Sequence, residues 1–278
     1  MRGGSELEGY LRHIRVCRNF LLPGERTPFR LGGAQVGWVA PRLADALRAL
    51  PEITATADGL GLDDLAALPH INRDLAAGGL FRWRGEAFDV RATPDGPVLA
   101  QLDRGALPAF GVEAVGVHLN GLVRRADGLH LWVAKRAANK ALDPGKLDHL
   151  VAGGVPAGLS PDETLIKEAA EEAAIPAALA AQARHVGLVA YTMERPEGLR
   201  RDRLYCYDLE LPEDFTPRAA DGEVESFALW PAARVLEAIR DSDDFKFNVP
   251  LVLLDCFLRH GLIGGDIAAA LRNALHAR

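Results

Sequence analysis

The sequence predicts a mixed α/β fold, in which an α/β/α layered domain follows a small α+β unit. From residue 113 onward, β-rich runs alternate with helical segments, and a long loop precedes the strongest helix. Such alternation is typical of layered α/β domains. Upstream, short helices and a hairpin signal dominate, so the composition changes near residue 112. Because 278 residues suffice for two modest domains, we expect units over 1–112 and 113–278.

The N-terminal unit is predicted from its prolines, glycines and apolar spacing. Pro41 favours the start of a helix, since its missing N–H would be unpaired in a first turn anyway. Pro69 interrupts a later helical stretch, and Asp95-Gly96 is a hairpin signal. The expected elements are helices over residues 6–20 and 42–50, two short helices within 63–77 on either side of Pro69, and strands over 81–90 and 97–102.

The C-terminal unit is predicted from β-rich runs, turns and amphipathic stretches. A turn at 126–128 separates its first two strands, and a loop rich in Lys, Pro and Gly covers 136–158. Pro176 ends the helix that follows, because proline disfavours a helical conformation in the residue before it. The expected strands are 112–123, 129–134, 185–193, 203–209 and 223–230, and the expected helices are 161–174, 232–239, 249–259 and 267–276.

Composition and charge exclude several classes of protein. Apolar residues make up 49% of the chain and the net charge is −6, which excludes a disordered chain and gives no electrostatic reason to expect a nucleic-acid partner. No run reaches the roughly 18 apolar residues of a membrane span, and residues 1–6 lack the features of a signal peptide. Cys17, Cys206 and Cys256 have no CxxC spacing and are expected to be buried hydrophobes. We therefore expect a cytoplasmic protein with no membrane partner.

One segment carries the residues for chemistry. A glycine-rich loop at 153–160 leads into a helix that contains Glu168, Glu171 and Glu172. These positions are three and four residues apart, so the carboxylates share one helix face and repel one another. A hard divalent cation such as Mg²⁺ would offset that repulsion and bind phosphate oxygens. The alternative is a solvated acidic face on a surface helix. A P-loop is excluded, because Leu159 stands where its lysine must be.

The segment from Gly153 to Ile175 resembles a Nudix box, whose pattern is G-x5-E-x7-R-E-U-x-E-E-x-G-U. Its three helical glutamates all match. Three positions depart from the pattern, since Leu159 replaces Glu, Lys167 replaces Arg and Ala174 replaces Gly.

The departures have physical consequences. Lys167 keeps a positive charge but lacks the rigid fork of Arg, and Glu163, four residues earlier, is placed to pair with it. Leu159 removes a carboxylate, so we expect weaker metal binding. Ala174 stands where Gly usually adopts a left-handed conformation, which Ala tolerates poorly, so we expect the helix to end differently.

Flanking segments extend the resemblance to nearly the whole chain. They are similar to one Nudix subfamily, the Nudix part of certain fungal thiamine pyrophosphokinases and related stand-alone proteins. The resemblance implies a Nudix α/β/α sandwich and Mg²⁺-dependent hydrolysis of a diphosphate linked to an organic group, with thiamine diphosphate or its oxidised analogues cleaved to the monophosphate. The segments that carry it are 36–39, 83–86, 116–121, 132–136, 140, 144–148, 207–212 and 221–225.

The resemblance also implies roles for individual residues. Glu172 or Glu223 would take a proton from the attacking water, and Lys167 would orient the carboxylates. Bound metal would be Mg²⁺, with Mn²⁺ as a substitute. The implied metal ligands are the Gly153 carbonyl, Glu168, Glu171 and Glu172.

Two further groups of residues are candidates for substrate binding. Arg200, Arg201 and Arg203 are expected in a loop, where they either contact a diphosphate or are solvated. Trp38 and Trp83 either build the N-terminal core or stack on a substrate ring. The N-terminal unit would then select the substrate rather than catalyse.

Two other classes of function stay open. A non-catalytic diphosphate-binding or regulatory module could use the same scaffold, since fold does not fix function, although the three glutamates argue against it. A prenyl-diphosphate isomerase would release no phosphate. The expected partner is a small-molecule diphosphate, and a homodimer is one of the oligomeric states left open.

Overall fold

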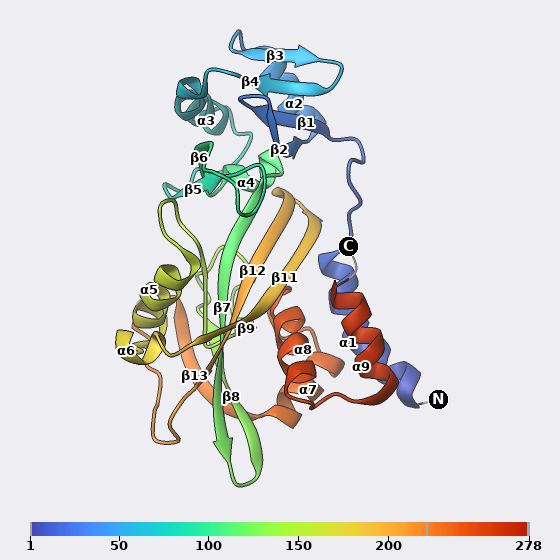
Figure 1. Cartoon of the computed structure of the whole chain (residues 1–278), viewed down its shortest axis with the longest axis vertical. Helices are drawn as coiled ribbons and strands as arrows, with labels where there is room; N and C mark the ends of the chain where they lie inside the picture. Colours follow the sequence, from blue (N-terminus) through green and yellow to red (C-terminus); the bar gives the residue numbers. More distant parts are fainter. Residues whose placement is uncertain (1, 221, 277–278) are drawn as a thin grey trace.

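The computed structural model describes residues 2–220 and 222–276, and a mixed seven-stranded sheet lies at its centre (Figure 1). The strand order is β11-β12-β7-β8-β13, with β10 paired to β7 and β9 paired to β8. Among these pairs, β12 and β7 are parallel and the others are antiparallel. The strands are β7 (Glu113–Arg125), β8 (Gly128–Arg136), β9 (Leu147–Asp148), β10 (Val151–Gly154), β11 (Arg184–Arg195), β12 (Gly198–Glu210) and β13 (Val224–Pro231).

The sheet divides beside β7. β10 pairs with residues 116–119 of β7, and β8 pairs with residues 121–125 of the same strand. β12 occupies the opposite edge over residues 113–122, so β10 and β8 follow one another along a single edge. Hydrogen bonding along this edge of β7 is therefore shared between β10 and β8, and the two strands separate where β10 leads into the glycine-rich loop.

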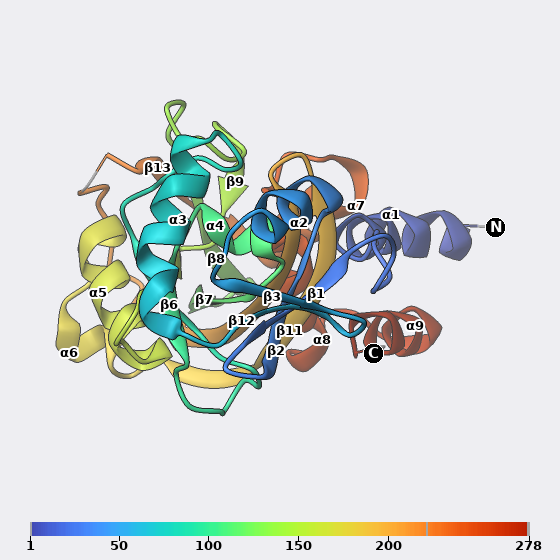
Figure 2. The ribbon, with the colours of Figure 1, turned by 90° about the horizontal axis from the view of Figure 1, so that it is seen from above.

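Helices cover both faces of the sheet, which confirms the predicted α/β/α sandwich (Figure 2). On one face, Leu165 and Ala169 of α5 share a buried cluster with Val117 and Leu119 of β7. On the other face, a larger apolar cluster joins the sheet to the C-terminal helices. The helices are α5 (Pro161–Ala173) and α6 (Ala177–Ala180) on the first face, and α7 (Ala232–Asp241), α8 (Val249–Arg259) and α9 (Gly265–His276) on the second.

The first helix, α1 (Arg2–Cys17), packs with the last three rather than with the N-terminal unit. Tyr10, Ile14 and Cys17 are buried in the same cluster as the C-terminal helices. Just beyond α1, the Arg18 guanidinium donates to the Ala274 carbonyl of α9 at 2.6 Å. The expected boundary at residue 112 stays a prediction, but the start of the chain lies against its end.

The N-terminal unit contains a four-stranded sheet that the sequence pattern did not predict. Its order is β2-β1-β4-β3, and Phe29, Leu31, Leu60 and Leu62 from β1 and β4 fill its core. Its strands are β1 (Thr27–Leu31), β2 (Ala34–Val39), β3 (Ile53–Thr56) and β4 (Gly59–Leu62), and a separate hairpin consists of β5 (Ala87–Val90) and β6 (Ala100–Asp103). Its helices are α2 (Pro41–Arg48), the 3₁₀ turn η1 (Leu65–Ala67), α3 (Leu68–Ala77) and α4 (Ala106–Phe110).

Several element boundaries differ from those expected, each for a local reason. Pro69 lies in the first turn of α3 and so begins that helix instead of dividing one. The expected strand over 81–90 starts only at Ala87, because the Asp103 carboxylate accepts hydrogen bonds from the backbone N–H groups of residues 84–86 and holds them in a turn. The loop expected over 136–158 contains β9 and β10.

Two properties of the described residues bear on the expected class of protein. Within residues 2–220 and 222–276, no helix has both the length and the apolar character to cross a membrane. Cys17, Cys206 and Cys256 are free thiols and all three are buried, as predicted.

Candidate functional site

The glycine-rich loop ends in a strong N-terminal cap for α5. The Ser160 hydroxyl accepts from the Glu163 N–H at 3.2 Å, and the Glu163 carboxylate accepts from the Ser160 N–H at 2.9 Å. This capping box fixes the direction in which the loop enters the helix. Glu163 is thereby held at the cap, so the expected pair between Glu163 and Lys167 is not what the structure shows.

Lys167 instead pairs with the glutamates of its own helix. Its Nζ donates to Glu168 Oε1 at 3.0 Å and to Glu171 Oε2 at 2.6 Å. The hydrogen bond to Glu171 makes the largest contribution to the raised pKa of Lys167. The side chains of Lys167 and Glu171 are about half exposed, whereas that of Glu168 is 17% exposed. The lysine therefore positions two of the three carboxylates, as the resemblance implied.

Glu172 lies beneath the surface, not on a solvated face. Its residue exposure is 7%, and Oε2 accepts from the backbone N–H of Ala152 on β10 at 3.0 Å. Burial raises the pKa of Glu172 to about 8, the Ala152 hydrogen bond opposes this, and the charges of Asp148, Glu168 and Glu223 add to it. A carboxylate in such surroundings is typical of a functional site.

Gly153 is required because Glu168 packs directly against its backbone. A Cβ on Gly153 would lie 2.6 Å from Glu168 Cδ, closer than side chains tolerate. Burial raises the pKa of Glu168. The close approach explains why the loop carries glycine at this position.

The ladder between β10 and β7 decides which backbone carbonyl faces the glutamates. In an antiparallel strand, the N–H and C=O of one residue point to the same side, and the next residue points to the other side. The Ala152 N–H points to Glu172, so the Ala152 carbonyl also points away from β7. The Gly153 oxygen lies on the β7 side, 3.1 Å from the place of a Cβ on Gly116. The carbonyl on the side of Glu172 is thus that of Ala152. The resemblance to a Nudix box had implied the Gly153 carbonyl as the metal ligand.

Glu223 lies near the same carboxylates but on a second element. It directly precedes β13, and its carboxylate accepts a hydrogen bond from Lys140. Its charge is among the causes that raise the pKa values of both Glu168 and Glu172, so it is near enough to act on them electrostatically. Burial by itself would raise the pKa of Glu223, but Lys140, Arg104 and Arg136 lower it overall. Its neighbour Asp221 in the expected turn lies outside the described residues.

This set of donors fits a hard divalent cation. Glu168, Glu171 and Glu172 come from α5, Glu223 from the start of β13, and the Ala152 carbonyl from the free side of β10. All are oxygen donors, which Mg²⁺ and Mn²⁺ accept. Carboxylates that are taken out of water need compensation by a cation or by hydrogen bonds. The residues present are therefore suited to hold Mg²⁺.

The end of α5 differs from the expectation. Ala174 adopts the left-handed conformation, with φ 53° and ψ 34°, and its N–H reaches the Ala169 carbonyl. The Ile175 N–H bonds the same carbonyl at 3.0 Å. Ala174 thus ends the helix as the glycine of the usual pattern would, at the steric cost of its Cβ.

The three arginines proposed to bind substrate are engaged within the protein. They lie on β12 rather than in a loop. Arg200 donates to the Asp202 carboxylate at 2.8 Å, Arg201 to the Gly111 carbonyl at 3.1 Å, and Arg203 to Glu113 at 2.9 Å. The contacts of Arg201 and Arg203 tie β12 to Gly111 and to Glu113 at the start of β7, whereas Arg200 pairs within β12. These contacts give the guanidinium groups a structural role.

Trp38 and Trp83 lie apart from one another in the N-terminal unit. Trp38 is half-buried on β2, and its carbonyl accepts from the Arg26 guanidinium at 3.2 Å. Trp83 is 44% exposed in the loop before β5. Neither belongs to the buried cluster of this unit, so the structure does not place them in its core, and their role in substrate binding stays a prediction.

The N-terminal hairpin makes contacts with the glycine-rich loop that no sequence pattern indicated. The Ala157 N–H donates to the Ala87 carbonyl at 2.8 Å, and the Gly158 N–H donates to Asp89 Oδ2 at 3.2 Å. A Cβ on Gly154 would lie 2.6 Å from Phe88 Cζ. Residues 87–89 thus form part of the site's surroundings, although about 65 positions separate them from the loop in sequence.

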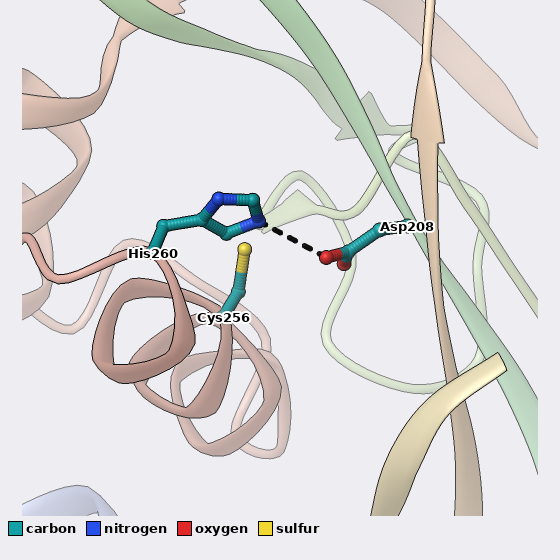
Figure 3. Close-up of side chains that lie close together, drawn as sticks. All are labelled: Asp208, Cys256 and His260. Atoms are coloured by element: carbon teal, nitrogen blue, oxygen red, sulfur yellow. Dashed lines mark hydrogen bonds and ion pairs between the residues drawn. The ribbon is translucent and has the colours of Figure 1, made fainter. Parts of the chain in front are cut away.

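A second group of potential metal ligands is better explained as a structural network. Figure 3 shows Asp208, Cys256 and His260 close together between β12 and α8. Arg259 donates to both oxygens of Asp208, and His260 Nε2 lies 3.1 Å from Oδ2. Burial raises the pKa of the Cys256 thiol, which disfavours the thiolate that metals require. The Asp208 carboxylate is already neutralised by Arg259, so we assign the cluster to structure.

Comparisons of the sequence with known proteins identify its family. The family model described as NUDIX domain matches residues 116–248. Nudix hydrolase 20, chloroplastic, from Arabidopsis thaliana is 39% identical over 279 residues, which cover 93% of this chain and 75% of that protein. Nudix hydrolase 24, chloroplastic, from the same plant is 38% identical over 275 residues, with 94% and 75% covered. The crystal structure of DR0079 from Deinococcus radiodurans is 23% identical and covers 62% of this chain and 99% of that one, with a TM-score of 0.48. The chain therefore belongs to the Nudix family and is a Nudix-type hydrolase.

Proposed function

We propose that this hydrolase cleaves a diphosphate linked to an organic group, and that it uses Mg²⁺ for the reaction. The observation that carries the proposal is the group of oxygen donors beside β10, where Glu172 accepts from the Ala152 N–H and Glu168 packs against Gly153. Glu223 is near enough to act on both carboxylates electrostatically. Such a set of oxygen donors suits a cation that in turn binds phosphate oxygens.

The surroundings of each residue indicate its role in the reaction. Glu168, Glu171, Glu172 and the Ala152 carbonyl would hold Mg²⁺, which when bound neutralises phosphate charge and lowers the pKa of a coordinated water. Lys167 orients Glu168 and Glu171 through its two hydrogen bonds.

Glu223 is our candidate for the general base. Its pKa is lowered by its cationic neighbours, so its carboxylate is ionised at neutral pH, and its side chain is about half exposed. An ionised and accessible carboxylate can accept the proton of an attacking water. Glu172 is buried, and its hydrogen bond to β10 suits it better to holding the metal.

For the organic group, we propose thiamine diphosphate or its oxidised analogues, cleaved to the monophosphate. Support comes from the similarity of the flanking segments to the Nudix part of certain fungal thiamine pyrophosphokinases. The segments include residues 36–39 and 83–86, and thus the N-terminal unit. The two plant relatives also match over more than nine tenths of this chain.

The test is a turnover assay with a panel of organic diphosphates, thiamine diphosphate and oxothiamine diphosphate among them. Purified protein is incubated with Mg²⁺, and products are followed by ³¹P NMR and chromatography. Monophosphate and inorganic phosphate from a thiamine compound would support the full proposal. Turnover of another diphosphate alone would overturn the thiamine assignment and keep the chemistry. Binding of the panel without any turnover would favour the non-catalytic module, and an isomerised prenyl diphosphate without phosphate release would favour the isomerase.

A further inference from the structure

The N-terminal unit supports the glycine-rich loop through the hairpin β5–β6, which lies directly above the loop that enters α5 (Figure 1). The two hydrogen bonds from Ala157 and Gly158 to β5 fasten the loop to the hairpin. The Phe88 ring fills the space that a side chain at Gly154 would take. The hairpin is thus in contact with the segment that joins β10 to α5.

Arg104 extends from the end of this hairpin toward β10. Its Cζ lies 5.8 Å from the centroid of the Phe88 ring and 3.9 Å from the place of a Cβ on Gly154. The preceding residue, Gly153, faces Glu168, and successive residues of a strand point to opposite faces, so Arg104 lies across β10 from Glu168. The charge of Arg104 is also among those that lower the pKa of Glu223. A guanidinium from the N-terminal unit therefore lies beside the strand that carries the candidate metal site.

The partners of Arg104 leave it able to bind a ligand. Its Nη1 donates to Glu86 Oε2 at 2.8 Å, but the side chains of Arg104 and Glu86 are 53% and 38% exposed. Such exposed pairs contribute little to stability and exchange readily with other partners. By contrast, Lys140 and Lys167 are bound to the site's own carboxylates.

We propose that Arg104 binds a phosphate group of the substrate and so completes the diphosphate site from the N-terminal unit. A guanidinium recognises phosphate oxygens through two parallel hydrogen bonds. In the complex, the phosphate takes the place of Glu86 at the guanidinium. This inference rests on the proposed function, since it deepens the description of the same site.

The test compares four variants in two measurements. Arg104→Gln removes the charge, Arg104→Lys keeps it without the fork, and Glu86→Gln removes the intramolecular partner. Arg73→Gln on α3 is the control, since Arg73 is an exposed arginine of the same unit. The first measurement is calorimetric binding of methylenediphosphonate, a diphosphate analogue with a P–C–P bridge that does not hydrolyse, with Mg²⁺ and again in EDTA. The second is the KM and kcat of the diphosphate that the protein turns over.

We expect Arg104→Gln to weaken methylenediphosphonate binding and to raise KM by about tenfold or more, the loss typical of one charge-assisted contact. Arg104→Lys should recover part of the loss, and Arg73→Gln should match the wild type. Glu86→Gln should bind at least as tightly as the wild type, because it frees the guanidinium. If the ion pair were merely structural, Arg104→Gln and Glu86→Gln would change binding and KM alike.

Unchanged binding and KM in Arg104→Gln would overturn the inference, as would equal losses in Arg104→Gln and Glu86→Gln. These outcomes can be told apart from a failure of the proposed function. If the proposed function is wrong, the wild type turns over no diphosphate, but the binding of methylenediphosphonate still tests the role of Arg104.

Discussion

Replacement of Glu172 should lower activity without unfolding the protein. Glu172→Gln keeps an acceptor for the Ala152 N–H and removes a buried negative charge, so the fold should persist. We expect kcat with Mg²⁺ to fall by about 100-fold or more, because the substitution takes away a charge that the metal needs. Steady-state kinetics and thermal unfolding in EDTA measure the two effects. A variant that turned over at the wild-type rate would show that Glu172 is no metal ligand.

Lys167 sets how well the carboxylates are organised before metal binds. It contacts Glu168 and Glu171 by single hydrogen bonds, whereas Arg would offer two parallel ones. We expect the wild type to need relatively high Mg²⁺ and to accept Mn²⁺ well, and Lys167→Arg to lower the Mg²⁺ concentration for half-maximal rate. A metal titration of both proteins at one saturating substrate concentration decides this. An unchanged or higher requirement in a folded variant would mean that Lys167 does not orient these groups.

Ala174 offers a test of backbone conformation. With φ at 53°, its Cβ opposes the left-handed conformation that ends α5, a cost of roughly 1 kcal/mol or more. Ala174→Gly removes this cost. Glycine also gives the unfolded chain more conformational entropy, which opposes part of the gain. We therefore expect a net increase of about 0.5–1 kcal/mol in the free energy of unfolding. Urea unfolding in EDTA measures it, and a loss of stability would contradict the argument.

Some of the site could be predicted from the sequence and some could not. Glu171 and Glu172 each lie about one helix turn after Glu168, so their spacing brings each of them near Glu168. The spacing did not show that Glu172 is buried while Glu171 is about half exposed. The orientation of the Ala152 carbonyl depends on strand register, and Arg104 reaches the site only through tertiary packing. Neither follows from local pattern. Arg200, Arg201 and Arg203 were expected in a loop but lie on β12, where two of them pair with carboxylates and Arg201 donates to a backbone carbonyl. Their part in substrate binding stays a prediction.

Some helices and strands could likewise be predicted from the sequence, and others could not. Long periodic helices such as α5 and α8 were predicted within a residue or two. The strands β1–β4 have only four to six residues each and contain glycine or turns on glycine, such as Gly32-Gly33 and Gly59. Glycine weakens strand propensity, and such strands gain their stability from pairing and burial. No strand was therefore predicted within residues 27–62, where the structure has a four-stranded sheet.

The hairpin β5–β6 is expected to hold the glycine-rich loop in place. Asp89→Ala removes the acceptor of the Gly158 N–H. We expect faster hydrogen exchange over residues 155–160 and a severalfold lower kcat, because the loop loses one of its two hydrogen bonds to β5. Asp89 also accepts from Arg91 and Gln101 within the hairpin, so the unfolding temperature is measured alongside. Asp45→Ala, which removes an exposed pair on α2, is the matched control. Equal exchange in both variants would show that the hairpin does not restrain the loop.

At the scale of the whole molecule, a buried histidine, His149, makes stability depend on pH. His149 is 3% exposed, and neither ring nitrogen has a hydrogen-bond partner among the described residues. Burial lowers the pKa of His149 from 6.5 to about 4. Since the folded state resists protonation, the contribution of His149 is complete above pH 6.5 and is lost as the pH falls toward 4, up to about 3 kcal/mol.

The measurement is the difference in unfolding temperature between the wild type and His149→Gln at several values from pH 4.5 to 7.5. The raised pKa of Glu172 acts in the opposite direction, but it is common to both proteins and cancels in the difference. We expect the wild type to lose stability relative to the variant on acidification. A difference that stayed constant across this range would contradict the assignment.

The contact between α1 and α9 has a consequence for the order of events during synthesis. Helix α1 is made well before α9, since synthesis adds about 5–20 residues per second. The Arg18 contact with Ala274 spans 256 positions, so α1 has no α9 to pack against until the last of these helices has been made. Helix α1 therefore gains this part of its packing late, although it precedes α9 in the chain. Release of a chain that stops before α9 would leave Tyr10 and Ile14 without part of their cover, a ready target for chaperones and proteases.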